Sequence, residues 1–359
     1  MSAEGTRLRV ALIGCGRIGA HTPERLRATA PPGWIPVSHA QAIRSTPGLE
    51  LVAVCDVEEE AARTTAAQLE VEAWFSDYRE MIRALRPDLV SVATRTEGRC
   101  DAVEFAAANG VRGLHVEKPL GRSPAECRRA VGALERAGIP VTYGTTRRWM
   151  DVFRLAWRMA QSRELGELRQ LTIEFGRAPL LWTHPHSFDL MVWFASRPDP
   201  VSVQASCALD PADVRGQLVD ADPAVENAWV QFTDGFNAAI TCAPGLNVRL
   251  AGDRGSLTVA ADGARLTKQA RTHADRPYFG PPQPVDFTAE CSGTQRAFRE
   301  LANAVLGRGL CGITPREILL SNLLGFACAW SSLQGGRRVC LEDVPDGLTI
   351  TGRQAKNYA

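Results

Sequence analysis

The amino-acid sequence predicts an α/β fold, with a doubly wound parallel sheet in its first half and an α+β domain in its second. Up to about residue 145, apolar strands alternate with helical stretches, and this alternation is typical of parallel sheets. After residue 145 the pattern changes. Segments such as 168–175 alternate apolar and polar residues, as half-exposed strands do. We therefore predict two domains, over residues 1–145 and 146–359.

The first predicted strand, residues 8–13, is apolar and leads directly into the sequence Gly-Cys-Gly-Arg-Ile-Gly. The spacing G-x-G-x-x-G after a buried strand is typical of a dinucleotide-binding turn. Its first glycine allows the tight turn, the second lets the backbone approach a pyrophosphate, and the third lets the next helix pack closely. A glycine-rich surface turn is the alternative. The residues that we expect to line a dinucleotide here are Gly14, Gly16, Arg17, Ile18 and Gly19.

An acidic residue, Asp56, ends the second predicted strand, residues 49–55. A carboxylate at this place can accept hydrogen bonds from both ribose hydroxyls of an adenosine and would repel a 2′-phosphate. Asp56 therefore favours NAD over NADP as the cofactor. It also precedes a helical run, so capping of that helix is a second interpretation, and both can hold together.

The chain between the glycines and Asp56 is longer than the roughly 20 residues that are typical, and we assign the surplus to an insertion over about residues 20–48. Thr22 and Pro23 predict the cap and first position of a short helix. Ser38 predicts the cap of a second short helix that ends near Arg44. The insertion lies beside the expected cofactor mouth.

Two further buried strands, residues 87–93 and 113–116, end in polar residues. Ligands bind at the carboxyl ends of strands in open parallel sheets, so Thr94 is expected to contact the cofactor. Lys118 lies just past the second of these strands and would face the nicotinamide end. Its charge could stabilise an alkoxide and it could pass a proton. A solvated loop lysine is the alternative, although the chain has only three lysines.

A second candidate segment carries His184, His186 and Asp189 around Pro185, which suits a first helical position. His186 and Asp189 are three residues apart and would share one helix face. A neutral histidine can act as acid or base near neutral pH. The alternatives are a core histidine bonded to a carboxylate, or a metal site, and we expect no metal because no further ligand cluster is evident.

Composition excludes several function classes. The formal net charge is +1, and a nucleic-acid surface would need clustered basic residues. The sequence has no apolar run long enough to span a bilayer and no visible signal peptide. Its ten cysteines form no C-x-x-C pair, a pattern that fits free thiols in a reducing cytoplasm. We expect a cytoplasmic protein with no nucleic-acid or membrane partner.

These residues together resemble the glucose–fructose oxidoreductase/inositol dehydrogenase (Gfo/Idh/MocA) family. The resemblance covers nearly the whole chain, and its matching segments are 14–19, Asp56, 117–120, 144–149, 166–168, 186–189 and the C-terminal helices. The family implies an N-terminal Rossmann domain and a C-terminal α+β domain with an open mixed sheet, which usually supports homodimers or homotetramers. It further implies NAD(P)-dependent oxidation or reduction at a hydroxyl or carbonyl of a sugar, cyclitol or related polyol.

The resemblance also implies roles for individual residues. Lys118 would contact the reacting oxygen and also the cofactor, and Glu117 would contact the nicotinamide ribose. His186 would be the acid/base, and Arg148 would line the substrate pocket.

The sequence departs from the family pattern near this histidine. The family commonly has aspartate where this chain has Trp182, and glycine where it has His184. Asp189 could take over from the aspartate, His184 could join the proton path, or Trp182 could stack on a sugar or the nicotinamide. Arg95 and Arg99 also replace residues that are frequent in the family. These changes point to an unusual substrate, for which an anion is one candidate.

Three functions remain open at this stage. The leading one is an NAD-dependent dehydrogenase that acts on a secondary alcohol of a sugar-like substrate. The second is NAD-assisted glycoside cleavage or elimination without net cofactor turnover. The third is a non-catalytic NAD(H)-binding protein, which the missing aspartate makes conceivable.

Overall fold

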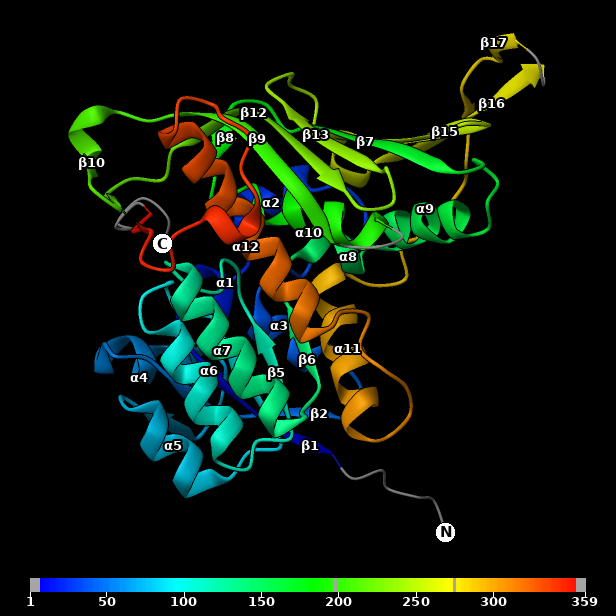
Figure 1. Ribbon diagram of the computed structural model, residues 1–359. Helices are drawn as coiled ribbons and strands as arrows, with labels where there is room; N and C mark the ends of the chain where they lie inside the picture. Colours follow the sequence, from blue (N-terminus) through cyan, green and yellow to red (C-terminus); the bar gives the residue numbers. More distant parts are fainter. Residues whose placement is uncertain (1–6, 196–198, 274–275, 353–359) are drawn as a thin grey trace.

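The first sheet has six parallel strands in the order β3-β2-β1-β4-β5-β6 (Figure 1). The computed structural model describes residues 7–195, 199–273 and 276–352. The strands are β1 (Leu8–Ile13), β2 (Leu49–Cys55), β3 (Ala73–Phe75), β4 (Leu89–Val92), β5 (Gly113–Val116) and β6 (Val141–Tyr143). Their register pairs Ile13 with Cys55 and with Val92, and Val116 with Tyr143. The strands therefore end together, which confirms the predicted doubly wound sheet and brings the residues that follow them to one edge.

Helices cover both faces of this sheet, because side chains alternate between the faces along each buried strand. Val10 and Leu12 belong to one apolar cluster, Ala11 and Ile13 to the other. The Val10 face packs against α3, α4 and α11, and the Ala11 face against α5, α6 and α7. The bounds are α3 (His39–Arg44), α4 (Glu59–Gln68), α5 (Tyr78–Leu85), α6 (Arg99–Ala108), α7 (Pro124–Ala137) and α11 (Gly293–Val305).

The predicted insertion interrupts the helix that follows the glycine turn. It separates α1 (Arg17–Ala20) from α3 and contains α2 (Glu24–Thr29). Ser38 holds the cap position of α3 as predicted, although its side chain makes no capping hydrogen bond. The prediction for Thr22 is wrong, because Pro23 is the cap residue of α2. The Thr22 hydroxyl instead accepts hydrogen bonds from the backbone N–H groups of Val37 and Ser38 at 3.2 Å.

The second sheet is mixed and has ten strands, eight of them in the path β17-β16-β15-β14-β7-β13-β12-β8, with β9 paired to β12 and β18 to β16. Strands β7 and β13 run parallel. Hairpin turns at Asp234-Gly235 and Asp262-Gly263 join β12 to β13 and β15 to β16. The bounds are β7 (Leu168–Glu174), β8 (Ala178–Pro179), β9 (Pro200–Ala208), β12 (Ala224–Phe232), β13 (Asn237–Thr241), β14 (Asn247–Gly252), β15 (Gly255–Ala260), β16 (Arg265–His273), β17 (Arg276–Phe279) and β18 (Gln283–Pro284).

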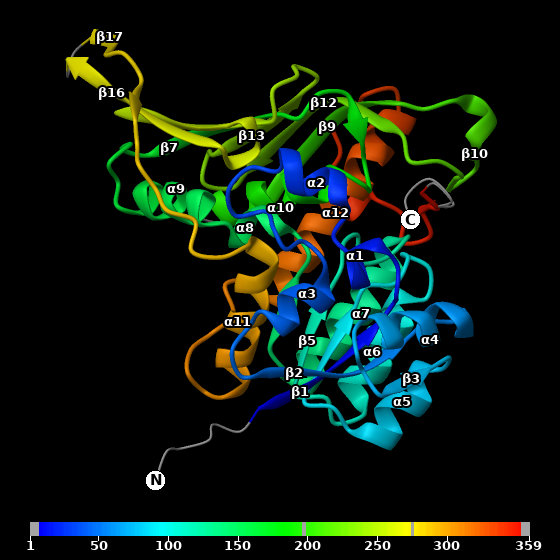
Figure 2. The same ribbon diagram turned by 180° about the vertical axis from the view of Figure 1, so that it is seen from behind.

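One face of the second sheet is covered by α8 (Thr146–Trp149), α9 (Asp151–Gln161), α10 (Pro185–Phe194) and α12 (Pro315–Leu333). These helices lie between the two sheets in both views (Figures 1 and 2). α11 packs against β5 and β6 of the first sheet as well as against α8 of the second domain. A small third sheet joins β10 (Val214–Arg215), β11 (Leu218–Val219) and β19 (Thr349–Ile350). Among the described residues, none of the helices is both long and apolar enough to cross a bilayer.

Candidate active site

The glycine turn has the form that dinucleotide binding needs. Gly14 adopts a φ of +102°, and a Cβ on it would lie 2.7 Å from the Ala93 carbonyl carbon. A Cβ on Gly19 would lie 2.0 Å from the Gly14 oxygen, so packing excludes side chains at both positions. Gly16 differs, since a Cβ there would meet no atom within 4 Å. That open space is where the sequence predicts a pyrophosphate.

Asp56 follows β2 and faces the glycine turn. Its Oδ2 accepts a hydrogen bond from the Cys15 backbone N–H at 2.7 Å, and its Oδ1 accepts one from Glu58 N–H at 3.1 Å. The helix cap itself is Glu58, so the capping interpretation of Asp56 is wrong in its simple form. Carboxylate oxygens have further lone pairs, and Asp56 can still accept ribose hydroxyls.

Thr94 and Arg99 lie at the next strand end. The Thr94 Oγ1 is buried and has no hydrogen-bond partner among the described residues. A buried hydroxyl without a partner is costly, and a ligand at the strand edge would supply one. The buried Arg99 guanidinium donates to the carbonyls of Thr94 and Pro119, so it ties the end of β4 to the loop that carries Lys118.

Lys118 is half-buried and reaches the second domain. Its Nζ donates to the Trp182 carbonyl at 2.9 Å and lies 4.3 Å from the centre of the Trp182 ring. Burial lowers the pKa of this ammonium group, Glu117 opposes the shift, and the charges of Arg99 and Arg147 add to the lowering. Burial and the nearby positive charges thus favour loss of the Lys118 proton, which suits a role in acid–base chemistry.

Glu117 is buried and bonded to its neighbours. Its Oε2 accepts the Lys118 N–H at 3.0 Å, and its Oε1 lies 3.2 Å from Nε2 of His39. Burial raises the pKa of this carboxyl, but the hydrogen bond to His39 and the charges around it lower the pKa to about 2. The expected contact between Glu117 and the nicotinamide ribose stays a prediction.

The structure also gathers a cluster that the sequence did not predict. The side chains of His39, His115 and Glu117 are buried, and their possible ligand atoms lie within 4.8 Å of one another. His39 is already bonded to Glu117 and, at 2.8 Å, to Ser91, and His115 to Thr142 at 2.9 Å. An ion would have to displace the bond between His39 and Glu117, so existing hydrogen bonds account for most of this cluster.

His184 and His186 stand at the start of α10, with Pro185 at its first position as predicted. Burial and the charge of Arg147 lower the pKa of His184 to about 4. Burial lowers the pKa of His186 well below its ordinary value, and Arg147, Lys118 and His184 act in the same direction. Both imidazoles are therefore neutral at pH 7. The buried Nδ1 of His186 has no partner among the described residues.

Trp182 occupies the mouth between the domains. Its side chain is 40% exposed, and its ring lies near Lys118 and 5.6 Å from the Arg17 guanidinium carbon. Asp222 accepts the backbone N–H groups of Leu181 and Trp182 at 2.7 and 3.0 Å. Because Arg17 belongs to the glycine turn, a dinucleotide that passes from that turn to Lys118 has to stack on the indole or displace it.

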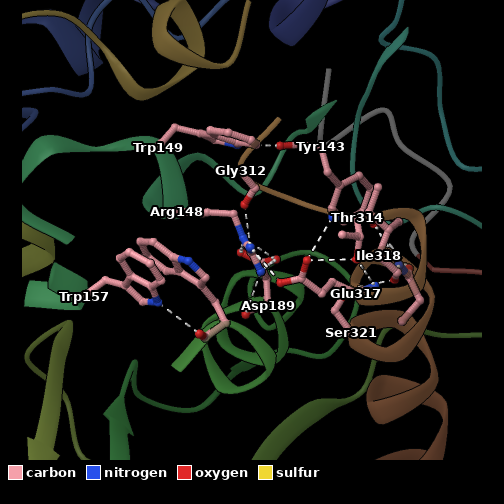
Figure 3. A network of polar contacts seen from close by, with 12 residues as sticks. Tyr143, Arg148, Trp149, Trp157, Asp189, Gly312, Thr314, Glu317, Ile318 and Ser321 are labelled. Atoms are coloured by element: carbon pink, nitrogen blue, oxygen red, sulfur yellow. Dashed lines mark hydrogen bonds and ion pairs between the residues drawn. The ribbon is translucent and has the colours of Figure 1, made fainter. Parts of the chain in front are cut away.

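Arg148 and Asp189, expected to contact substrate, belong to a network of polar contacts (Figure 3). Asp189 is fully buried, and its two oxygens accept from Arg148 Nε at 3.1 Å. The Arg148 guanidinium also bonds the Gly312 carbonyl at 2.8 Å and Glu317 at 3.0 Å. Both side chains are committed to this network and cannot reach a ligand as they stand. The expectation that Asp189 supports His186 fails for the same reason.

Four residues of the site escaped the sequence analysis: His39, Arg99 as a strand tie, Arg147 and Asp222. Arg147 pairs with Asp262 at 2.7 Å, and its charge lowers the pKa of Lys118 and of both histidines. The substrate role was predicted for its neighbour Arg148, although both arginines lie in the family segment 144–149. A burial pattern along α8 would not have separated them, since both are buried.

Comparison with known proteins places the first domain. Residues 8–145 match the model of the oxidoreductase family with an NAD-binding Rossmann fold. D-apiose dehydrogenase of Paraburkholderia graminis is 29% identical over 45% of this chain and 38% of its own length. The NAD(+)-dependent scyllo-inositol 2-dehydrogenase of Bacillus subtilis is 29% identical over 45% of this chain and 42% of its own. The match thus spans about two-fifths of each curated relative.

The structural likeness extends over both domains. An oxidoreductase domain protein from Kribbella flavida superposes with a TM-score of 0.75 and 18% identity over 95% of this chain and 100% of that one. At this identity the likeness shows a shared fold. Residues 8–145 are thus similar to the NAD-binding Rossmann domain of the Gfo/Idh/MocA oxidoreductases.

Proposed function

We propose that this protein is an NAD-dependent oxidoreductase that transfers hydride between nicotinamide and a secondary alcohol or ketone of a sugar, cyclitol or related polyol. One observation carries the proposal. Lys118 from the first domain reaches the segment of the second that carries His186, because its Nζ donates to the Trp182 carbonyl at 2.9 Å. An ammonium group and a neutral imidazole at the carboxyl edge of a Rossmann sheet supply what alcohol oxidation needs.

The residues present fit a dinucleotide. Open space at Gly16 would take the pyrophosphate, with Arg17, Ile18 and the glycines around it. Asp56 would hold the adenosine ribose, and the unpartnered Thr94 hydroxyl would bond the cofactor further along the edge. When bound, NAD⁺ supplies a two-electron acceptor. The charge of Asp56 disfavours a 2′-phosphate, so NADP is the weaker candidate.

Proton transfer falls to the protein. In the oxidation direction, His186 accepts the hydroxyl proton through a ring nitrogen as the substrate carbon gives up its hydride. Lys118 donates a hydrogen bond to the same oxygen and stabilises the negative charge that develops on it. The lowered pKa of His186 keeps the base neutral before the reaction. His184 stands next to this path, and its Nδ1 is bonded to Ser187 at 3.0 Å.

The substrate class follows from the relatives and is part of the proposal. The two curated relatives are named for apiose and scyllo-inositol, both of which are polyhydroxylated. Trp182, half-exposed at the mouth, offers an aromatic face of the kind that stacks on the apolar face of a sugar ring.

The test is to purify the protein, add NAD⁺ with a panel of sugars, sugar acids and cyclitols, and follow the absorbance of reduced nicotinamide. A substrate-dependent rise supports the proposal. Product formation without any change in free cofactor would instead favour NAD-assisted elimination. NADH binding without turnover on the whole panel would favour a non-catalytic protein.

Assembly and location belong to the same proposal. The face of the second sheet that the helices leave open carries the outward row Trp229, Ala239, Thr172, Arg249 and Thr258. A second copy of the chain that covered this face would make a homodimer, and two such dimers a tetramer. All ten cysteines carry free thiols, which supports a cytoplasmic location.

A further inference from the structure

The insertion forms a closed loop over residues 21–38 whose base is bonded shut. Thr22 bonds to the backbone of Val37 and Ser38, as described, and its hydroxyl lies 3.4 Å from the Ser38 hydroxyl. Both side chains are buried. His39, the next residue, anchors the base to the first domain through Ser91 and Glu117. The base of the loop is thus fixed to Glu117, the residue that precedes Lys118.

The tip of the loop reaches the second domain. Trp34 Nε1 donates to the Asp262 carbonyl at 3.0 Å, in the hairpin turn between β15 and β16. The Gly33 carbonyl accepts the Gly293 N–H at 2.8 Å, at the start of α11. Figure 2 shows the loop, with α2, rising from α1 and α3 to the level of the second domain's helices. The loop therefore bridges the two domains.

A column of stacked side chains runs from this tip to His184, at the start of α10. The Arg147 guanidinium carbon lies 5.2 Å from the Trp34 ring and 4.5 Å from the Phe175 ring. The Phe175 ring stacks on His184, with centroids 6.5 Å apart and planes 18° from parallel. Asp262 binds Arg147 from the side, so the same turn holds both Trp34 and Arg147. His184 is the cap residue of α10, two positions before His186.

We propose that the loop over residues 21–38 is an interdomain strap and that Trp34 is a positioning residue, which holds Arg147, Phe175 and His184 in the wall that presents His186. Its catalytic consequence rests on the proposed function, whereas its structural consequence does not. Removing the indole leaves Arg147 with an aromatic ring on one side only and removes the donor to the Asp262 carbonyl. The column then loosens at its far end, at the start of α10.

The test compares amide hydrogen exchange in Trp34→Ala with the wild type and with Arg27→Ala. Arg27 lies in the same loop, and its half-exposed side chain pairs with exposed Glu24, so it is a matched control. Trp34→Ala should speed exchange about tenfold in peptides covering residues 175–190, and Arg27→Ala should leave those peptides unchanged. Trp34→Phe keeps an aromatic ring and loses only the N–H donor, so it should restore most of the protection and covers the case in which Trp34→Ala does not fold.

Turnover provides the second readout once a substrate is known. Trp34→Ala should lower kcat about tenfold and leave the KM for NAD unchanged, and Trp34→Phe should recover most of kcat. Faster exchange confined to residues 21–38 in both Trp34 variants would overturn the strap. Unchanged kcat together with faster exchange in 175–190 would overturn the catalytic consequence alone. If no substrate is turned over, the exchange experiment still decides the structural claim.

Discussion

Two neighbouring regions of the second domain use the same kinds of residue in different ways. In the first region, which we call the network side, Arg148 and Asp189 are buried and bonded to each other. Arg148 is also bonded to Glu317 and to the Gly312 carbonyl. On the site side, Arg147, next in the chain to Arg148, sits between aromatic rings near His186. Both regions are built from α8 and α10.

This contrast shows why a motif alone does not assign roles. Consecutive residues on a helix point in different directions, so Arg147 and Arg148 diverge. A group with every polar atom paired stabilises the fold. A group such as His186, with a buried nitrogen that lacks a partner among the described residues, has capacity for a ligand.

The largest expected effect lies on the network side. Arg148→Met leaves the Asp189 carboxylate buried without its partner, and breaking a buried pair in this way costs about 3–5 kcal/mol of unfolding free energy. Urea unfolding measures it. The control is Arg316→Met, whose exposed pair with Asp199 should be worth at most about 1 kcal/mol. Equal stability of the two variants would remove the distinction between the regions.

On the site side, Lys118→Ala should leave stability nearly unchanged and lower kcat/KM by about 10²–10³-fold, the loss typical of one donor to a developing oxyanion. Steady-state kinetics on a substrate found in the panel measures this. Lys268→Ala is the matched control, because Lys268 pairs with Glu164 far from the edge of the first sheet. Turnover that survives in Lys118→Ala would rule out its catalytic role.

His184 sharpens the comparison through pH. Its pKa of about 4 in the folded protein lies below the value of about 6.5 expected for the unfolded chain. Between these two pH values the unfolded state therefore binds more protons than the folded state. The free energy of unfolding that comes from keeping His184 neutral is complete above pH 6.5 and is lost as the pH falls to 4. The loss is about 3 kcal/mol. Urea unfolding from pH 8 to 4 should show a shallower fall in His184→Asn, whereas identical slopes would contradict the assignment.

The smallest expected effect is at the far end of the site. Asp56→Asn keeps the shape and removes the charge, so the hydrogen bonds to ribose weaken by about 1.5–3 kcal/mol. NADH affinity should fall, and the preference for NADH over NADPH should shrink. Fluorescence titration with both nucleotides measures the ratio, and Asp77→Asn, at the exposed cap of α5, is the control. A preference that stays the same would place cofactor selection elsewhere.

Local patterns were enough to predict part of this structure. The glycine turn, Asp56 and the strand ends follow from short motifs, and parallel register then brings them to one edge. The partners of Glu117 and Asp189 were out of reach, since His39 and Arg148 are distant in sequence. Such pairs are set by how whole elements pack, as is the return of α11 to the first sheet. In the sequence, the loop over residues 21–38 was visible only as surplus length between the glycine turn and Asp56.

The most direct test of the account is a crystal structure of the protein with NAD⁺ bound. We expect the pyrophosphate against Gly16, the adenosine ribose on Asp56, and the nicotinamide beside Lys118 and His186, with the Trp182 indole stacked on the cofactor or swung aside. A dinucleotide bound away from the glycine turn, or a nicotinamide kept from Lys118 by an unmoved indole, would contradict it.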